Sequence, residues 1–378
     1  MKVRSAILRQ SGLPHPYAQS RPLSIETVTL APPGPGEVLV KIAAAGVCHS
    51  DLSGINGDRP RPLPLAIGHE AAGVVEALGP GVDDLAAGDH VVMSFSPVCG
   101  ACTFCAEGRP ALCEKGAAAN GAGTLLSGAR RFSCDDGALI NHHCGVCAFS
   151  EYSVIARQSI VKIRKDIPLT EAALFGCAVM TGVGTVMNTC QVRPGQSVAV
   201  IGLGGVGLAA LLGAVASGAG QIVAVDLNPA KLEVARSLGA TDTFLANEPD
   251  VVQAIRKATG GGVDHAVEMA GVARAFELAY AITRRGGTTA TAGLPPPPTL
   301  FSIPAVALVA EERVIRGGYM GSCVPSRDIP RYIDLYLAGK LPVNRLLSAT
   351  GPLDGINEAF DRLDKGEVIR HVIVMDGN

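Results

Sequence analysis

Residues 198–207 read VAVIGLGGVG, and this stretch decides the fold class of the chain. An apolar, strand-like run leads directly into Gly202, Gly204 and Gly207, and an Ala- and Leu-rich segment typical of a helix follows. A G-x-G-x-x-G pattern between a strand and a helix forms a tight turn, and the amide-rich start of the helix can bind a pyrophosphate. The pattern alone is weakly specific, so the interpretation depends on the sequence around it.

A second apolar strand, IVAVD, ends at Asp226, nineteen residues beyond Gly207. A carboxylate at this position accepts hydrogen bonds from both hydroxyls of an adenosine ribose and repels a 2′-phosphate, which favours NAD over NADP. The alternative is a structural glycine turn in which Asp226 caps a helix. The residues predicted to hold the dinucleotide in this region are Gly202, Gly204, Gly205, Val206, Gly207 and Asp226.

Short strands alternate with helical periodicity from about residue 170 to about residue 320. The strands VAVIG, IVAVD, HAVEM and TTATAG are rich in apolar and β-branched residues, as expected where helices cover both faces of a parallel sheet. Residues up to about 95 instead contain short β-like runs between turn signals, and residues 97–148 are expected to be loop-like. The sequence therefore predicts an α/β domain combined with a β-rich region.

Composition describes a well-buried globular enzyme and excludes several other classes. The chain has 378 residues, 48% of them hydrophobic and 17% charged, which leaves room for two domains. A net charge of −2 gives the chain no excess of positive charge with which to bind nucleic acid or an anionic membrane surface. No apolar run is long enough for a membrane span, and the first residues lack the apolar core of a signal peptide. We therefore expect a cytoplasmic protein that binds neither nucleic acid nor membrane.

Four cysteines fall within residues 99–113, which read CGACTFCAEGRPALC. Two C-x2-C steps followed by C-x7-C can place four thiolates around one tetrahedral zinc ion with no position left open, so the site is structural. A pair of disulfides is the alternative, but the odd total of eleven cysteines fits reduced thiols and metal ligands better. The predicted ligands of this zinc ion are Cys99, Cys102, Cys105 and Cys113.

Three further candidate ligands lie outside this lobe, namely Cys48 in GVCHSDL, His69 in GHE and Cys177 in LFGCAVMTG. Two thiolates and one imidazole leave a zinc ion a fourth position for water or substrate, as in a catalytic site. Each residue alone has a simpler interpretation, since a single cysteine in an apolar run is most often a small core residue. Their combination with the four-cysteine lobe and the dinucleotide motif supports a catalytic zinc ion.

These motifs, taken in order, resemble the zinc-containing medium-chain alcohol dehydrogenases over essentially the whole chain. The shared motifs are GVCHSDL, GHEAAGVV, the four-cysteine lobe, RFSC, FSEYSV, GCAVMTGVGTV, GLGGVG, IVAVD and GEVIR. The resemblance implies NAD-dependent, reversible oxidation of an alcohol to an aldehyde or ketone, with two zinc ions per subunit. The length of residues 113–134 is similar to that in the animal-type and glutathione-linked formaldehyde dehydrogenase branches, which favours a homodimer over a homotetramer.

The resemblance also implies a two-domain fold with the active site in the cleft. A Rossmann domain with a six-stranded parallel sheet is expected at residues 179–321. A mainly β, barrel-like (GroES-like) catalytic domain is expected to comprise residues 1–178 and 322–378.

By position, the resemblance assigns catalytic roles to residues beside the ligands. Ser50 matches the relay hydroxyl that takes the alcohol proton, and Asp51 matches the carboxylate that orients a ligand imidazole. Glu70 matches an acid just behind the metal, and His49 stands where relatives use Arg or His near the pyrophosphate. Ser53 replaces the histidine that ends the animal relay, so His49 or solvent is expected to complete the proton path.

The resemblance adds three cofactor contacts: Thr181 at the nicotinamide end, Lys231 at the adenosine ribose and Arg370 at the pyrophosphate. The structural alternatives are an ordinary turn hydroxyl for Thr181, as also for Ser50, and a buried ion pair between Glu70 and Arg370.

The substrate is less well defined by the sequence. His143 and Cys144 stand where relatives often carry an aromatic residue and a leucine, which suggests a polar wall and room for aryl or medium-chain primary or secondary alcohols. The alternatives are glutathione-linked formaldehyde oxidation, for which an arginine beyond the lobe is missing, a zinc-free reductase, and a non-catalytic dinucleotide-binding protein. A third metal site at residues 142–147 is the less favoured interpretation of that histidine- and cysteine-rich stretch. The predicted pocket residues are Phe95, His143, Cys144, Leu294 and Tyr319.

Overall fold

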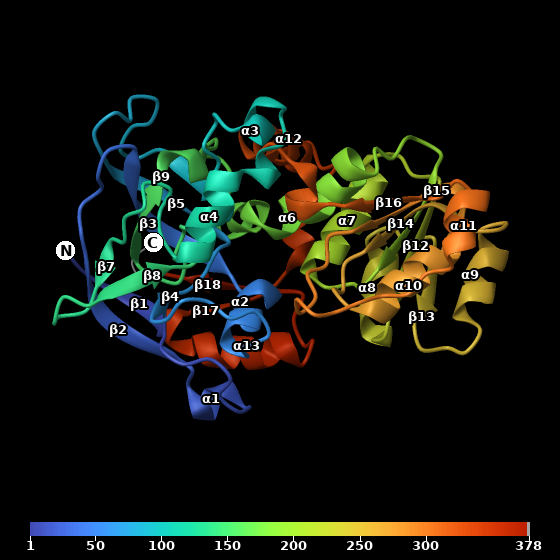
Figure 1. Cartoon of the computed structure of the whole chain (residues 1–378), viewed down its shortest axis with the longest axis horizontal. Helices are drawn as coiled ribbons and strands as arrows, with labels where there is room; N and C mark the ends of the chain where they lie inside the picture. The colour runs from blue at the N-terminus through green and yellow to red at the C-terminus, as the bar shows by residue number, and fades with distance from the viewer. Residues whose placement is uncertain (376–378) are drawn as a thin grey trace. The chain divides into compact units, whose positions relative to one another are not determined.

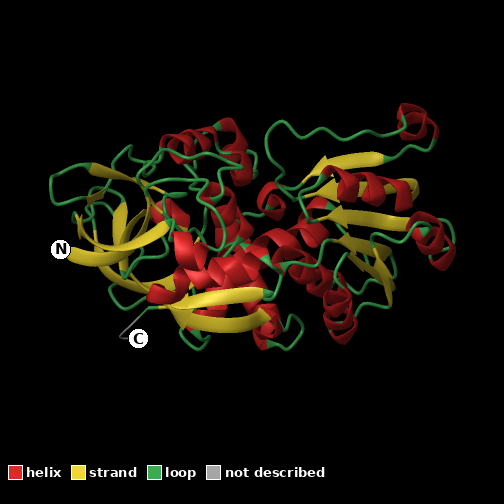
Figure 2. Cartoon of the chain, turned by 90° about the horizontal axis from the view of Figure 1, so that it is seen from below, coloured by secondary structure: helices red, strands yellow, loops and turns green. Residues whose placement is uncertain are grey.

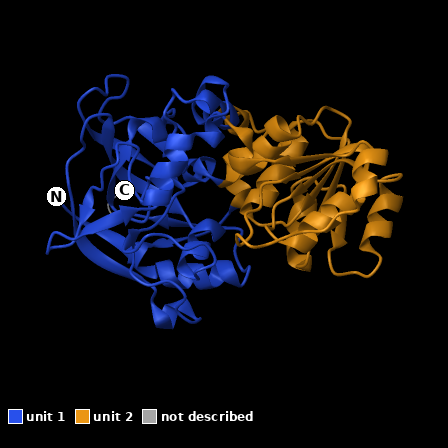
Figure 3. Cartoon of the chain, in the orientation of Figure 1, with its two compact units in different colours: residues 1–177, 324–333, 347–378 blue, residues 178–323, 334–346 orange. Residues whose placement is uncertain are grey.

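The computed structural model describes residues 1–375, which fall into two compact units (Figure 3). Unit 1 comprises Met1–Cys177, Val324–Ile333 and Leu347–Asn378, and unit 2 comprises Ala178–Cys323 and Asp334–Leu346. The sequence-based interpretation assigned residues 334–346 to the catalytic domain. They belong to unit 2 because the short helix η6 (Val343–Leu346) packs against helix α7 (Gly205–Ala216) of that unit.

Unit 2 contains one six-stranded parallel sheet with the strand order β13-β12-β11-β14-β15-β16 (Figure 1, Figure 2). Ala199 and Ile201 of β11 pack with residues of α9 and α10, while the alternating residues Val198 and Val200 are buried on the opposite face. This two-sided burial explains the continuous apolar runs in the sequence and confirms the predicted Rossmann fold. The strands are β11 (Ser197–Ile201), β12 (Gln221–Asp226), β13 (Asp242–Leu245), β14 (Val263–Glu268), β15 (Thr283–Thr291) and β16 (Val314–Gly317).

Helices connect these strands, and α7 begins directly at the glycine-rich turn. Further helices of this region are α6 (Ala178–Gly184), α8 (Pro229–Ser237), α9 (Val251–Ala258), α10 (Ala273–Ile282), α11 (Ala305–Ala310) and the short turns η4 (Thr185–Thr189) and η5 (Tyr319–Ser322). Helix α12 (Pro325–Leu337) continues the chain after the sheet.

Unit 1 is mainly β, as predicted, and contains a closed barrel, β1-β2-β7-β8-β4, and a seven-stranded sheet. The sheet has the order β10-β6-β5-β3-β18-β17, and β9 also pairs with β3. Its strands and those of the barrel are β1 (Lys2–Leu8), β2 (Leu23–Leu30), β3 (Glu37–Gly46), β4 (Leu65–Ala66), β5 (Ala71–Leu78), β6 (His90–Met93), β7 (Phe132–Ser133), β8 (Leu139–His142), β9 (Tyr152–Ala156), β10 (Ile160–Lys162), β17 (Leu347–Pro352) and β18 (Arg370–Val374).

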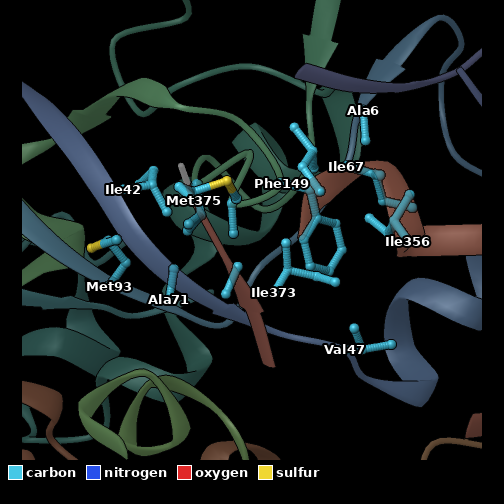
Figure 4. Packing of buried hydrophobic residues seen from close by; sticks show 14 of the residues in the cluster. Ala6, Ile42, Val47, Ile67, Ala71, Met93, Phe149, Ile356, Ile373 and Met375 are labelled. Carbon is cyan, nitrogen blue, oxygen red and sulfur yellow. The ribbon is translucent and has the colours of Figure 1, made fainter. Parts of the chain in front are cut away.

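The core of unit 1 packs around Phe149, with Ile67, Ile356 and Ile373 beside it (Figure 4). Phe149 meets Phe360 edge to face, at 6.0 Å between ring centroids. Strand β18 from the end of the chain pairs antiparallel with β3, so residues more than three hundred positions apart become neighbours. This pairing brings the start of β18 to the segment that follows β3, where the candidate site is built.

Helices of unit 1 are short. They are α1 (Tyr17–Ser20), α2 (His49–Ile55), α3 (Thr103–Ala106), α4 (Glu114–Ala122), α5 (Leu169–Ala172), α13 (Ile356–Asp364), η1 (Pro110–Leu112), η2 (Arg157–Ser159), η3 (Ala173–Gly176) and η7 (Leu353–Gly355). The expectation of a loop throughout residues 97–148 was wrong for α4. This helix has an Ala-rich sequence without an apolar stripe, and its ends are fixed by the Cys113 cap and the left-handed Gly123.

Within the described residues, no single helix is long and apolar enough to span a membrane. One bent pair of helices, Leu169–Gly176 with Ala178–Thr189, reaches the required length and composition only when its two parts are taken together.

Candidate active site

Three separate segments of unit 1 bring the predicted catalytic ligands together. Cys48 lies between β3 and α2, His69 precedes β5, and Cys177 follows η3. Their ligand atoms, together with a carboxylate oxygen of Glu70, all lie within 4.8 Å of one another. His69 Nε2 is 3.3 Å from the Cys177 sulfur, and all four residues are buried. The structure therefore assembles the donor set that the sequence predicted.

The electrostatics of this cluster fit a bound cation. A hydrogen bond from Cys177 holds the pKa of the Cys48 thiol well below its usual value, and the same interaction raises the pKa of Cys177 well above it. Two thiols and an imidazole crowded together and shielded from water are the donors that zinc prefers in a site with an open position. Cys48, His69 and Cys177 therefore fit a catalytic zinc ion.

Asp51 is placed to orient the ligand imidazole. It lies on α2, is fully buried, and its Oδ1 oxygen is 2.8 Å from His69 Nδ1, which leaves Nε2 directed toward the thiols. Burial alone would raise the pKa of Asp51, but the adjacent His69 keeps it below the usual value. His49 and Ser50 form the first turn of the same helix, with His49 exposed and Ser50 half-buried.

Glu70 and Arg370 form a buried ion pair beside the thiols. Arg370 Nη1 is 3.3 Å from a Glu70 carboxylate oxygen and donates to the Val47 carbonyl at 3.2 Å. Burial raises the pKa of Glu70 to about 7, against the opposing effect of Arg370. Gly46 permits this approach, since a Cβ atom there would lie 2.8 Å from the Glu70 carboxyl carbon. The buried ion pair between Glu70 and Arg370, which the sequence analysis gave as an alternative, is thus present. A contact of Arg370 with pyrophosphate stays a prediction.

Two predicted pocket residues lie directly against His69. The Phe95 and His143 rings meet it edge on, with centroids 5.7 Å and 5.6 Å from its own. Cys144 is buried beside His143, and although burial opposes the shift, His143 lowers the pKa of the Cys144 thiol to about 7. The remaining predicted pocket residues, Leu294 and Tyr319, belong to unit 2, and their contact with substrate stays a prediction.

The four-cysteine lobe forms a second candidate zinc site in unit 1. The sulfurs of Cys99, Cys102, Cys105 and Cys113 lie within 4.8 Å of one another, and every cysteine in the described chain is unbridged. Backbone N–H groups point at these sulfurs, with Cys99 N 3.2 Å and Gly116 N 3.3 Å from the Cys113 sulfur. This backbone support stabilises thiolates, so the lobe fits a closed structural zinc ion.

The predicted dinucleotide turn lies in unit 2 between β11 and α7. Gly202 has φ +90°, and a Cβ atom on Gly207 would lie 1.8 Å from the Gly202 carbonyl oxygen. A Cβ atom on Gly204 would meet no other part of the described chain within 4 Å, which leaves space for a phosphate group. Gly205 and Val206 begin α7. The turn therefore needs glycine at 202 for its positive φ angle and at 207 for the close approach of the backbone.

Asp226 is held against this turn by backbone hydrogen bonds. Its Oδ2 accepts from Leu203 N at 2.6 Å and its Oδ1 from Asn228 N at 2.9 Å. Lys231 lies half-buried on α8, close to the carboxyl end of β12, and Thr181 is buried on α6. The cofactor contacts of Lys231 and Thr181 stay predictions.

The sequence analysis missed Glu268, which organises the carboxyl end of β14. Its buried carboxylate accepts from Ala270 N and Gly271 N, both at 2.6 Å, and from the Thr291 hydroxyl at 2.6 Å. A glutamate in the apolar run HAVEM was the available signal, because a buried charge needs several donors.

Comparisons with known proteins agree with this geometry. Residues 34–165 match the model of the alcohol dehydrogenase GroES-like domain, and residues 205–338 match that of the zinc-binding dehydrogenases. The chain is 38% identical over 377 residues to S-(hydroxymethyl)glutathione dehydrogenase of Synechocystis, covering 99% of this chain and 100% of that protein. It is 39% identical to alcohol dehydrogenase class-3 of Drosophila melanogaster, covering 94% and 95%.

A solved structure, benzyl alcohol dehydrogenase from Acinetobacter calcoaceticus, has a TM-score of 0.92 and 33% identity, with 99% of each chain covered. The fold and the two cysteine-rich sites thus define an NAD-dependent, zinc-containing oxidoreductase. The chain belongs to the zinc-containing alcohol dehydrogenase family, and the predictions of family, enzyme class, NAD and two zinc ions per subunit are confirmed.

Proposed function

We propose that this enzyme oxidises aryl or medium-chain primary or secondary alcohols with NAD, reversibly, to aldehydes or ketones. The observation that carries this proposal is the three-donor cluster of Cys48, His69 and Cys177 flanked by the Phe95 and His143 rings. A ring wall beside an open metal position suits a flat, apolar substrate. The likeness to a benzyl alcohol dehydrogenase supports the same substrate class.

The chain's residues have distinct parts in this proposal. When bound, zinc supplies a Lewis acid and NAD a hydride acceptor. Cys48, His69 and Cys177 hold the metal, and Asp51 fixes the His69 ring. Ser50, at the start of α2, accepts the proton of the alcohol hydroxyl and passes it toward solvent.

In unit 2, the glycine turn binds the pyrophosphate and Asp226 accepts hydrogen bonds from the adenosine ribose, which selects NAD. Thr181, Lys231 and Arg370 add the nicotinamide-end, ribose and pyrophosphate contacts that the family resemblance implies.

The test is the growth of NADH absorbance with primary, secondary and aryl alcohols, repeated after removal of zinc by a chelator and after zinc is restored. Turnover highest with aryl or medium-chain alcohols, lost with the chelator and regained with zinc, is the expected result. Turnover confined to short alcohols such as ethanol would contradict the proposed substrate class. Turnover that survives complete zinc removal would contradict the metal-dependent mechanism.

A second candidate is oxidation of the thiol adduct of formaldehyde with glutathione, which the names of several relatives favour. Arg59 and Arg61 follow α2 and form no ion pair within residues 1–375, so they offer cationic groups for the carboxylates of such an adduct. Formaldehyde would then be oxidised only in the presence of glutathione. Arg61→Ala would raise the KM for the adduct and leave that for benzyl alcohol unchanged.

We also propose a homodimer, formed by the open edge of the unit 2 sheet. Strand β16 ends the sheet order, and α11 beside it has no buried residue. Val306 and Val309 of α11 are 75% and 79% exposed, an apolar surface that a second copy could cover by pairing two β16 edges. Light scattering should give the mass of two chains, and Val306→Asp with Val309→Asp should give one. If the unmodified protein has the mass of a single chain, the proposal is refuted.

A cytoplasmic location is proposed on the chemistry of the cysteines. Both zinc sites need thiolates, and every cysteine in the described chain is unbridged. Reducing compartments preserve such sites, whereas oxidising ones favour disulfides. Fractionation of cells that produce the untagged protein would test this.

A further inference from the structure

His143 does more than line a pocket. Its Nδ1 nitrogen is 3.2 Å from Asp51 Oδ1, the same oxygen that lies 2.8 Å from Nδ1 of the ligand His69. We infer that His143 is a positioning residue of the catalytic zinc centre, which holds the Asp51 carboxylate in place so that Asp51 can orient His69. This inference rests on the zinc site and not on the choice of alcohol.

The three residues form one buried cluster built from three segments. Asp51 comes from α2, His69 from the turn before β5, and His143 from the turn after β8. One ligand-type atom from each lies within 4.8 Å of the others, and none of the three side chains is more than 2% exposed. A fully buried carboxylate needs hydrogen-bond donors, since its desolvation is costly. His69 and His143 both approach Oδ1, at 2.8 Å and 3.2 Å, while Oδ2 has no partner within residues 1–375, so His143 is the second ring available to donate to this carboxylate.

Two groups compete for the His143 Nδ1 nitrogen, and their chemistry indicates which ring nitrogen carries the proton. Gly68 N lies 3.3 Å from the same Nδ1 nitrogen, which can either accept from Gly68 or donate to Asp51. An unprotonated Nδ1 would direct its lone pair at a buried carboxylate 3.2 Å away, which is electrostatically unfavourable. We therefore assign the proton to Nδ1 and the hydrogen bond to Asp51. Either contact of His143 bears on His69, because Asp51 lies against the His69 ring and Gly68 directly precedes His69 in the chain.

The backbone fixes His143 in this place. Its N–H donates to the Ala66 carbonyl at 3.1 Å, and its carbonyl accepts from Val146 N at 3.0 Å and Cys147 N at 3.3 Å. The turn places Cys144 and Cys147 at φ +53° and +54°, in the left-handed region that non-glycine residues rarely adopt. Such strain persists only where surrounding contacts maintain it, and it is often found at functional sites.

Three variants separate a donor role from a packing role. His143→Phe keeps a ring against His69 but removes the donor, His143→Asn places an N–H near the Nδ1 position, and His143→Gln places it near Nε2. The matched control is His142→Gln, because His142 is equally buried but accepts from Arg131 N at 3.0 Å and, within residues 1–375, forms no hydrogen bond or ion pair with Asp51.

The readouts do not depend on turnover. They are the rate at which zinc is released to a coloured chelator, the visible absorption bands after cobalt replaces zinc, and the melting temperature. For His143→Phe and His143→Gln we expect release of one of the two zinc ions to be about 10- to 100-fold faster, with shifted cobalt bands. His143→Asn should return the zinc release rate and the cobalt bands toward those of the unmodified protein, and His142→Gln should leave the release rate and the bands unchanged.

Several results would overturn the inference. If His143→Phe keeps the original zinc release rate and cobalt bands while only the KM for alcohols changes, His143 is a pocket wall alone. Faster zinc release from the Asn variant together with normal release from the Phe variant would show that ring packing, not hydrogen bonding, matters. If His143→Phe does not fold, the Asn and Gln variants decide, since only the Asn variant should retain zinc normally. A wrong substrate proposal would leave all of these results unaffected.

Discussion

His142 provides a test of how burial in the barrel affects stability toward acid. Its side chain is 1% exposed and packs 5.3 Å from the Phe132 ring, between centroids. Nε2 accepts from Arg131 N, and Nδ1 has no partner in the described part of the chain. Burial lowers the pKa of His142 to about 3; Arg130 and Arg131 act in the same direction, while Glu37 opposes them. The ring is therefore neutral throughout the ordinary pH range.

Protonation of the unfolded chain gives the size of the effect. An unfolded histidine has a pKa of about 6.5, so its folded-state pKa is the lower of the two. The contribution to stability is then fully present above pH 6.5 or so and is lost as the pH falls toward 3. At pH 5, about 1.5 units below the unfolded-state pKa, proton binding stabilises the unfolded state, whereas the folded state stays unprotonated at His142. At about 1.4 kcal/mol per unit, His142 lowers the unfolding free energy by about 2 kcal/mol relative to pH 8.

The matched variant is His142→Gln, whose amide oxygen can accept the Arg131 N–H but does not titrate. Urea unfolding of both zinc-loaded proteins, followed by circular dichroism because the chain has no tryptophan, gives stability at each pH between 5 and 8. Effects shared by both proteins, such as protonation of the zinc ligands, cancel in the difference. The original protein should lose about 2 kcal/mol more than the variant on going from pH 8 to pH 5. Parallel curves across this range would refute the reasoning.

Four further predictions concern the two metal sites and the cofactor turn. Cys48→Ala should bind one zinc ion per subunit instead of two, by metal analysis, and lose turnover while keeping its circular dichroism; full turnover would contradict the role of Cys48. Cys105→Ser should lose the lobe zinc and lower the melting temperature while NAD binding in unit 2 is unchanged. Gly207→Ala should abolish NAD binding, measured by calorimetry, because its Cβ atom would lie 1.8 Å from the Gly202 carbonyl oxygen. Asp226→Ser should weaken NAD binding about tenfold or more and reduce the preference over NADP; an unchanged preference would remove Asp226 from this role.

The sequence was sufficient wherever the chemistry is local. The four lobe cysteines lie within residues 99–113, so their spacing alone predicts a closed zinc site. The turn at Gly202 to Gly207 is equally local, since a strand, a tight turn and a helix start follow one another along the chain. Helix α4 was not predicted, because its Ala-rich sequence has no apolar periodicity. Its start also depends on a contact that no local pattern shows, in which the Cys113 sulfur accepts a hydrogen bond from Gly116 N.

The catalytic ligands were predicted only in combination with the four-cysteine lobe and the dinucleotide motif, because Cys48 and Cys177 are far apart in sequence and each alone looks like a core residue. Sequence by itself thus determined the residue types and the two local motifs. Only the tertiary structure decided that His143 shares the Asp51 carboxylate with His69, and that Arg370 meets Glu70. Both contacts join segments brought together by strand pairing and barrel closure. The physical reason is that such pairing depends on the packing of the whole unit, and no periodicity within either segment records which distant residue it will meet.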